Sequence, residues 1–194
     1  MIKKFIDKLL GKTPKAAAPD SGAAPAGKRV EVPKSEHHID PKLVDERAVK
    51  VVSTLADAGF EAYIVGGAVR DLLVGMRPKD FDVATNATPE QVKGLFRRAF
   101  IIGRRFRIVH VVFGRGRQDR GLSEVIEVST FRAMVEAASA EQVTGNEKTS
   151  KSELAGKSHV VDAEGRVLRD NVWGPQIEDA ARRDFTVNAM YYDP

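Results

Sequence analysis

The chain has 194 residues, of which 31 are Lys or Arg, 27 are Asp or Glu and none is Cys. This length is enough for one domain with its own core, and the lack of cysteine excludes disulfide frameworks, cysteine-ligated metals and thiol catalysis. The net charge of +4 comes from two basic segments, residues 1–29 and 97–120. We therefore expect a cytoplasmic protein with a polyanionic partner.

Residues 1–32 are predicted to form a flexible basic leader. Residues 1–10 (MIKKFIDKLL) have the apolar spacing of a short amphipathic helix and are too short to span a membrane. Residues 11–28 are rich in Ala, Pro and Gly, which is typical of a linker. Two interpretations stay open for the first ten residues: a peripheral contact with a membrane surface or RNA, or a solvated leader.

Beyond the leader, helices and strands are mixed, and we expect one α+β domain over residues 33–194. Asp40 and Pro41 are predicted to open a helix that ends before Gly59. Further helices are predicted at Ala68–Val74, Pro89–Arg98 and from about Gln176. The predicted strands are Phe60–Val65, Asp80–Ala84, Arg107–Phe113, Val125–Phe131, His159–Ala163 and Val167–Asp170. Residues 133–158 lack apolar periodicity and are expected to be a mobile insertion.

The most informative spacing joins Gly66 and Gly67 to three later acids. Two glycines between a strand and a helix let the backbone approach a ligand closely, and the helix start offers N–H groups to a phosphate. Asp80 and Asp82 are two apart on a predicted strand, so both carboxylates should project from one face. Glu127 lies within a later apolar strand, where an acid needs a partner, and it is the candidate third carboxylate.

These carboxylates suit a metal site for phosphoryl transfer. Close carboxylates repel one another unless a cation lies between them, and Mg²⁺ prefers a few carboxylates together with substrate phosphates. Taken singly, an Asp-x-Asp is more often a solvated strand edge and Gly-Gly a plain turn. The combination, in this order, favours a two-metal site.

The same residues lie within longer motifs: YIVGGAVRDLLVGMRPKDFDV (Tyr63–Val83), TNATPEQVKGLF (Thr85–Phe96), IEVSTFR (Ile126–Arg132) and EDAARRDFTVNAMYY (Glu178–Tyr192). Together they resemble the catalytic head of class II nucleotidyltransferases of the polymerase β superfamily, the bacterial poly(A) polymerases and CCA-adding enzymes. GRRFRIVHVVF (Gly103–Phe113) is more similar to the poly(A) polymerases. The resemblance implies a mixed, largely antiparallel sheet flanked by helices.

The resemblance also implies a role for each matching residue. Asp80, Asp82 and Glu127 would be the catalytic metal ligands, and Asp184 would be a further active-site acid. A helix-surface salt bridge is the alternative for Asp184. The residues expected to bind the nucleotide are Gly66, Gly67, Arg70, Asp71, Arg132 and Arg183. Local ion pairs are the alternative interpretation of the arginine and aspartate positions in this set.

The basic segment 97–120 is predicted to guide RNA toward the carboxylates. Phe96, Phe100 and Phe106 are interleaved with its arginines, and this composition is typical of single-stranded RNA binding through phosphate contacts and base stacking, although the phenylalanines could instead be core. The expected RNA-binding residues are Arg97, Arg98, Arg104, Arg105 and Arg107, continued by Arg115, Arg117 and Arg120. His110 is expected to be a satisfied core or groove residue.

We expect a template-independent polyadenylating enzyme that acts on ATP and RNA 3′ ends with Mg²⁺ and needs no obligate protein partner. The alternatives are a CCA-adding tRNA nucleotidyltransferase and a non-catalytic RNA- or nucleotide-binding fragment. Family members carry neck and body domains after the head, and we expect these to be absent because the sequence stops at Pro194. The apolar residues 189–192 should then be left exposed.

Overall fold

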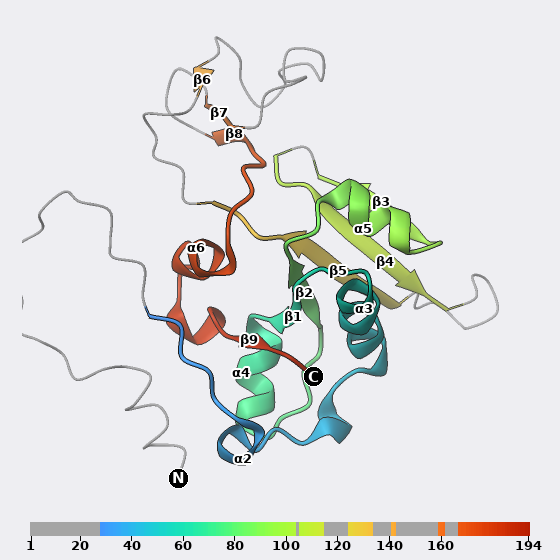
Figure 1. Ribbon diagram of the computed structural model, residues 1–194, viewed down its shortest axis with the longest axis vertical. Helices are drawn as coiled ribbons and strands as arrows, with labels where there is room; N and C mark the ends of the chain where they lie inside the picture. Colours follow the sequence, from blue (N-terminus) through green and yellow to red (C-terminus); the bar gives the residue numbers. More distant parts are fainter. Residues whose placement is uncertain (1–27, 104, 115–123, 134–140, 143–158, 162–166) are drawn as a thin grey trace, which may run out of the picture.

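The computed structural model describes residues 28–103, 105–114, 124–133, 141–142, 159–161 and 167–194, which form a large and a small sheet with helices (Figure 1). The large sheet has the strand order β3-β4-β5-β2-β1-β9, and the small sheet has the order β6-β7-β8. The strands of the large sheet are β1 Ala62–Val65, β2 Asp82–Thr85, β3 Ala99–Ile102, β4 Ile108–Phe113, β5 Glu124–Thr130 and β9 Tyr191–Tyr192. Those of the small sheet are β6 Glu141–Gln142, β7 His159–Val161 and β8 Val167–Asp170. The helices are α2 Lys34–His37, η1 Pro41–Leu43, α3 Glu46–Asp57, α4 Gly67–Leu73, α5 Pro89–Leu95, α6 Gln176–Ala181 and η3 Thr186–Asn188.

The prediction of a mixed, largely antiparallel sheet flanked by helices is confirmed. In the large sheet, β2 and β5 are parallel and the other neighbouring strands are antiparallel. The parallel pair lies at the centre of the sheet, and its two strands are joined through α5 and the β3–β4 hairpin.

One face of the large sheet packs against α3 and α5. Helix α3 contacts β1 and β2, while α5 contacts β3 and β4 (Figure 1). Ile64, Val83 and Val128 alternate inward from their strands and are buried with Leu55 of α3. Each such side chain contributes about 1.5–3 kcal/mol when it is fully buried, so this layer fixes the register of the central strands.

The other face carries a smaller apolar cluster. Its buried members are Val65, Ala84 and Phe131, and Tyr63 and Tyr191 pack against them. The rings of Tyr63 and Phe131 are stacked with centroids 6.3 Å apart. Because strand residues alternate between faces, Asp82 and Glu127 project on this face and not toward the main core.

Two helices differ from their predicted bounds by more than one residue, while α4 is shifted by a single residue. Asp40 and Pro41 start only the short η1, and α3 begins after a second cap, Asp45. Thr88 and Gln91 form a capping box at the start of α5, but α5 ends at Leu95, three residues before its predicted end. The chain then enters β3, a strand that was not predicted because its short apolar run lies within the basic segment 97–120, which was interpreted as an RNA-binding surface.

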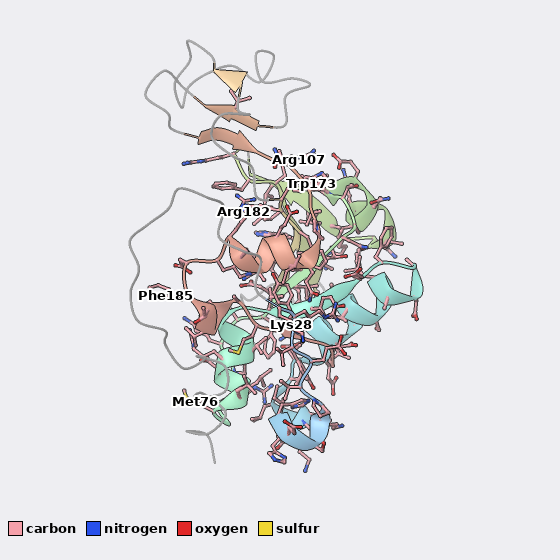
Figure 2. All side chains as sticks on the ribbon, turned by 60° about the vertical axis from the view of Figure 1, so that its left-hand side comes forward. Lys28, Met76, Arg107, Trp173, Arg182 and Phe185 are labelled. Carbon is pink, nitrogen blue, oxygen red and sulfur yellow. The ribbon has the colours of Figure 1, made fainter. Side chains whose placement is uncertain are left out.

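The C-terminal residues pair with the sheet, so the prediction that residues 189–192 are exposed is wrong. Met190 and Tyr192 pack against the main core, and Tyr191 packs against the smaller cluster because β9 pairs with β1. The exposed large apolar side chains in this region are Phe185 and Val187, together with Val74 and Met76. Figure 2 shows Phe185 beside η3 and Met76 near the end of α4.

Several predictions concern residues that the structure does not describe. The amphipathic helix over residues 1–10 and the following linker lie outside the described residues, as does most of the expected insertion, of which β6 is a described part. The two strands predicted at His159–Ala163 and Val167–Asp170 are present as β7 and β8, and they pair antiparallel. Within the described residues, no helix has both the length and the apolar character that crossing a membrane requires.

The start of α3 generates a prediction. Asp45 accepts hydrogen bonds from the backbone N and the guanidinium of Arg47, and these bonds hold the pKa of Asp45 below its usual range. We expect Asp45→Ala to lower the free energy of unfolding at pH 7 by about 1 kcal/mol in urea titrations. The loss should shrink as the pH falls through the low pKa of Asp45, because protonation then removes the same bonds from the wild type.

Asp57, at the opposite end of α3, supplies the control. It is exposed and lies where the helix dipole disfavours an acid, so Asp57→Ala should leave stability unchanged or slightly higher. Equal stability of Asp45→Ala and the wild type at pH 7 would contradict the role of the cap.

Candidate active site

Gly66 forms the turn between β1 and α4, Gly67 is the first residue of α4, and an arginine lies beside each of them. Gly66 has a φ of 73°, a left-handed conformation that glycine adopts without strain. A Cβ at Gly66 would lie 3.6 Å from Nη1 of Arg183, and one at Gly67 would lie 3.4 Å from Nη2 of Arg70. Two guanidinium groups therefore flank bare backbone, an arrangement suited to a bound phosphate.

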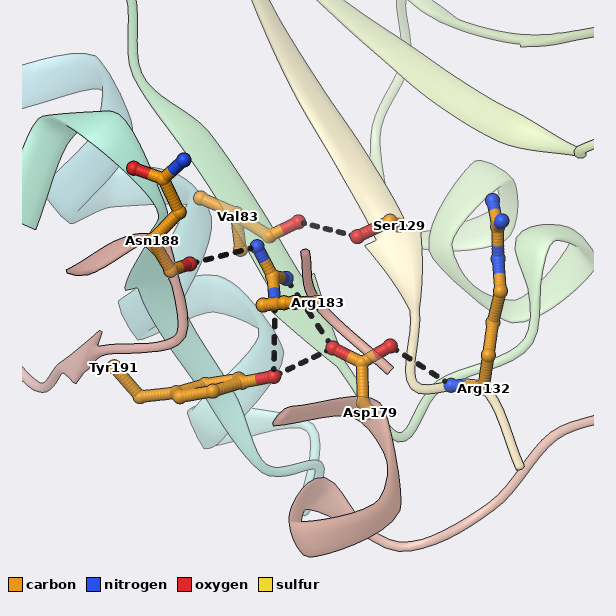
Figure 3. Close-up of polar contacts among 7 residues, drawn as sticks. All are labelled: Val83, Ser129, Arg132, Asp179, Arg183, Asn188 and Tyr191. Carbon is orange, nitrogen blue, oxygen red and sulfur yellow. Dashed lines mark hydrogen bonds and ion pairs between the residues drawn. The ribbon is translucent and has the colours of Figure 1, made fainter. Parts of the chain in front are cut away.

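Arg183 is held by three groups (Figure 3). Its Nε donates to the hydroxyl of Tyr191 at 3.3 Å, Nη1 donates to the backbone carbonyl of Asn188 at 3.3 Å, and Nη2 donates to Oδ2 of Asp179 at 3.2 Å. Burial opposes the charge of Arg183, but Tyr191 and Asp179 outweigh that effect and raise the pKa of the guanidinium. The cation is therefore fixed in place.

Asp179 on α6 is the acid at the centre of this network. Its Oδ1 accepts from the backbone N of Arg132 at 3.0 Å, and its Oδ2 accepts from the hydroxyl of Tyr191 at 2.6 Å as well as from Arg183. Burial and the bond to Asp179 raise the pKa of Tyr191, so the phenol keeps its proton. The sequence analysis did not single out Asp179, although its i to i+4 spacing from Arg183 is a signal that could have identified it.

Arg70 is oriented from two sides. Its Nε donates to Oδ1 of Asp71 at 2.8 Å, and its Nη1 donates to the side-chain oxygen of Asn188 at 3.2 Å. Asn188 therefore contacts both arginines of the glycine turn, one through its side chain and one through its backbone. The local ion pair that was the alternative interpretation of Arg70 and Asp71 is present, and nucleotide binding by them stays a prediction.

Asp82 and Glu127 lie side by side at the centre of the sheet, since the parallel register of β2 and β5 pairs them. Asp80 lies two residues before β2 and not within the strand as predicted. The Asp82 residue is exposed overall, but the protein around its carboxylate reduces hydration. That loss of hydration, followed by the charges of Glu127 and Asp80, raises the pKa of Asp82, while Arg183 acts in the opposite direction.

The carboxylates fit a cation chemically without forming a closed site. Among the residues that the structure describes, no three His, Asp or Glu side chains form a group that could hold a metal ion. The raised pKa of Asp82 reflects a negative charge that its surroundings do not fully compensate. Carboxylate oxygens are the ligands that Mg²⁺ prefers, so the donor set suits that ion and its binding stays a prediction.

Glu127 has a second neighbour that the sequence analysis did not pair with it. His110 on β4 lies opposite Glu127, and its Nε2 is 3.1 Å from Oε1 of Glu127. Phe100 on β3 lies opposite His110 in turn. Asp82, Glu127, His110 and Phe100 therefore form one row across four strands, and His110 has a polar partner, as expected.

Comparison with known proteins identifies the family. Residues 62–194 match the family described as the poly A polymerase head domain. The chain belongs to this family. It is 46% identical over 161 residues to poly(A) polymerase I of Salmonella typhi, which is 83% of this chain and 30% of that protein. It is 44% identical over 182 residues to poly(A) polymerase I of Haemophilus influenzae, which is 93% of this chain and 35% of that protein.

A solved structure has a similar fold. The crystal structure of the Bacillus stearothermophilus CCA-adding enzyme in complex with CTP has a TM-score of 0.50 and 29% identity, and the match covers 80% of this chain and 28% of that one. The chain thus spans about a third of the length of the relatives that it matches. The resemblance to poly(A) polymerases and CCA-adding enzymes is confirmed.

The two remaining predicted residues of the family motifs, Arg132 and Asp184, have different environments. Arg132 donates its backbone N to Asp179, while its guanidinium carbon lies 4.5 Å from the centre of the Phe106 ring. Asp184 is exposed, and its Oδ1 accepts from the backbone N of Phe185 at 2.9 Å. Their roles in the active site stay predictions, and it is Asp179 that holds Arg183.

The described arginines of the basic segment have different environments. Arg97 is exposed, and the guanidinium carbon of Arg105 lies 5.1 Å from the centre of the Phe106 ring. Arg98 donates to the carbonyl of Gly114, and Arg107 pairs with Glu90. Arg104, Arg115, Arg117 and Arg120 lie outside the described residues. Phe96 packs against the core, as the core interpretation of these phenylalanines expects. Phe100 and Phe106 are exposed, as the alternative of stacking on RNA bases requires.

The carboxylate pair generates a prediction about stability. We expect Asp82→Asn to raise the midpoint of thermal unfolding of the metal-free protein at pH 7, because it removes a charge that is poorly hydrated and that Glu127 and Asp80 repel. The gain should fade as the pH is lowered, since a raised pKa means that the folded wild type protonates Asp82 before the unfolded chain does. Calorimetry in EDTA checks this, with exposed Asp57→Asn as the control that leaves the midpoint unchanged or only slightly higher. An Asp82→Asn midpoint equal to that of the wild type would contradict the repulsion.

Proposed function

We propose that this chain is the head of an enzyme that adds AMP from ATP to the 3′-hydroxyl of RNA without a template. The observation that carries the proposal is the pairing of Asp82 with Glu127 on one sheet face, within electrostatic reach of Arg183, which lies beside the glycine turn that Arg70 also flanks. The relatives named poly(A) polymerase I support adenylation over other nucleotidyl transfers. The lack of cysteine suits a cytoplasmic location, which is part of the proposal.

In the proposed reaction, the RNA 3′ oxygen attacks the α-phosphorus of ATP. The bond from that phosphorus to the bridging oxygen of pyrophosphate breaks, pyrophosphate leaves with the bonding electron pair, and the hydroxyl loses its proton to solvent water. Mg²⁺ held by Asp80, Asp82 and Glu127 would supply a lowered pKa for the hydroxyl and would offset the charge of pyrophosphate.

The glycine turn is proposed to bind the triphosphate. Arg183 and Arg70 already face the bare backbone of Gly66 and Gly67, and the ion pair with Asp71 keeps Arg70 there. Guanidinium groups bind phosphate oxygens in fork geometry, so they suit this position better than lysines would. Arg132 is proposed as a further nucleotide contact and Asp184 as a further active-site acid, since both lie in the segment that matches the family.

The RNA 3′ end is proposed to reach the carboxylates across β3 and β4. Neighbouring strands lie about 4.8 Å apart, so Phe100 is about 14 Å from Asp82 along the row that crosses the sheet. Phe100 is 56% exposed, which leaves its ring available for stacking on a base. The residues proposed to contact RNA phosphates are Arg97, Arg98, Arg104, Arg105 and Arg107.

A CCA-adding activity is the second candidate, because the solved structure that matches at 29% identity is a CCA-adding enzyme. That activity would use the same carboxylates and glycine turn and would differ in the nucleotide chosen. The deciding observation is therefore which nucleotide is added to which RNA.

The test of function is an incorporation assay with each of the four nucleoside triphosphates, on single-stranded RNA and on tRNA lacking its 3′ CCA. We expect AMP to be added to single-stranded RNA by the longest natural form of the protein that contains this chain. Asp80→Ala and Asp82→Ala should each reduce incorporation by roughly 1,000-fold, because a bound metal supplies several kcal/mol of transition-state stabilisation. Glu127→Gln should be severely impaired as well.

Three results would contradict this proposal. Ordered addition of CMP and AMP to tRNA favours the CCA-adding enzyme. RNA binding without any nucleotide incorporation favours a non-catalytic module. An active Asp80→Ala/Asp82→Ala double variant would exclude the carboxylate mechanism, provided that circular dichroism shows the same fold.

The RNA surface generates a separate prediction. Arg97→Ala/Arg105→Ala should weaken binding of single-stranded RNA and reduce the slope of log K against log salt by about 0.7 for each lost phosphate contact. Fluorescence anisotropy at several salt concentrations measures both. The control is Lys34→Ala/Lys42→Ala on α2 and the following η1, since both lysines are exposed and α2 lies at the other end of the molecule from β3 (Figure 1). Equal losses from the two pairs would exclude a specific surface.

A further inference from the structure

Asp179 connects three parts of the chain through one carboxylate. It lies on α6, and its partners are the backbone N just after β5, the phenol of Tyr191 on β9, and the guanidinium of Arg183 (Figure 3). The Asp179 side chain is 11% exposed, so these contacts replace most of its hydration. All three partners donate, and an ionised carboxylate only accepts, so the chemistry of the network matches the residue at its centre.

We propose that Asp179 is a positioning residue that sets the guanidinium of Arg183 for the triphosphate; this rests on the proposed function. Arg183 has five N–H groups, and its bonds to Asp179, Tyr191 and Asn188 use three of them. Within the described residues, one N–H on each Nη is left for a ligand. Nη1 is also the atom that faces Gly66.

Fixing Arg183 in advance matters for two physical reasons. An arginine side chain loses considerable rotamer freedom when it is ordered, and the network meets that cost before the nucleotide arrives. Asp82 is also within electrostatic reach of Arg183, so a guanidinium released by Asp179 has a competing anion nearby. Asp179 therefore keeps Arg183 at the glycine turn and leaves Asp82 available for a cation.

Replacement by asparagine tests the role of the charge because it preserves shape. Oδ2 of Asp179 accepts from Tyr191 and Arg183, and Oδ1 accepts from the backbone N of Arg132. In either orientation, the amide group of asparagine would place a donor against a donor. One orientation turns the amide nitrogen against the guanidinium of Arg183, and the other leaves a neutral oxygen in place of a charged one, so either orientation weakens the hold on Arg183.

The experiment measures binding of ATP and of adenosine to the full chain by calorimetry and competition. Asp179→Asn should weaken ATP binding about ten-fold, the size of effect expected for one charge-assisted hydrogen bond, and should leave adenosine binding unchanged. A general loss of structure would weaken both ligands. In an Arg183→Ala background, Asp179→Asn should cause no further loss, because no guanidinium remains to be positioned.

Asp45→Asn is the matched control. Asp45 also pairs with an arginine and accepts from a backbone N, and its side chain is 14% exposed, close to that of Asp179. It caps α3 at a distance along the chain from the glycine turn, so its replacement should alter stability without altering the ratio of ATP to adenosine binding.

Tyr191→Phe keeps the test decisive if Asp179→Asn folds poorly. It removes one bond to Arg183 and retains the ring that packs against Tyr63 and Phe131, so it should cause a smaller loss of ATP binding with adenosine unchanged. Wild-type ATP affinity in both variants would overturn the inference, as would an equal effect of Asp179→Asn with and without Arg183. A wild-type protein that binds no ATP would overturn the proposed function as well.

Discussion

The repulsion between Asp82 and Glu127 is the constraint around which the rest of the site is arranged. Like charges directly opposite each other destabilise a strand pair, yet the parallel register of β2 and β5 enforces this pairing. Val83 and Val128 enforce it from the other face, because a slip of one residue would bring these buried side chains into water. The hydrophobic layer under α3 and α5 thus holds two carboxylates together that would otherwise separate.

The parts of the site that the sequence predicts are those that depend on short-range rules. Gly66 and Gly67 stand between an apolar strand and a helix, so their turn follows from local chemistry. The outward projection of Asp82 follows from the alternation that buries Phe81 and Val83. By itself, the Asp-x-Asp pattern could equally be a solvated strand edge. The family motifs, which occur in a fixed order along the chain, favour an active site instead.

The parts that the sequence did not predict depend on pairing between distant segments. His110 contacts Glu127 only because β4 and β5 pair in one particular register. Tyr191 and Tyr192 form a strand only because they pair with β1, a contact that the local sequence does not indicate. Asp179 and Asp184 are both acids close to Arg183 in sequence, and only the path of the chain from α6, which ends at Ala181, to Arg183 decides that Asp179 makes the ion pair. The family motif indicated Asp184, which directly follows Arg183. The structure instead pairs Arg183 with Asp179, four residues before it.

The balance of charge explains why an arginine so near the carboxylates does not neutralise them. Arg183 lowers the pKa of Asp82, but reduced hydration and the charges of Glu127 and Asp80 prevail, and the net shift is upward. Arg183 is also hydrogen-bonded to Asp179, so its positive charge mainly offsets that of Asp179 and does not cancel the charge of Asp82. The site therefore retains negative charge at the carboxylates and positive charge at the glycine turn. That separation suits the proposed reaction, in which the arginines would bind substrate phosphates and Asp82 and Glu127 would hold a cation.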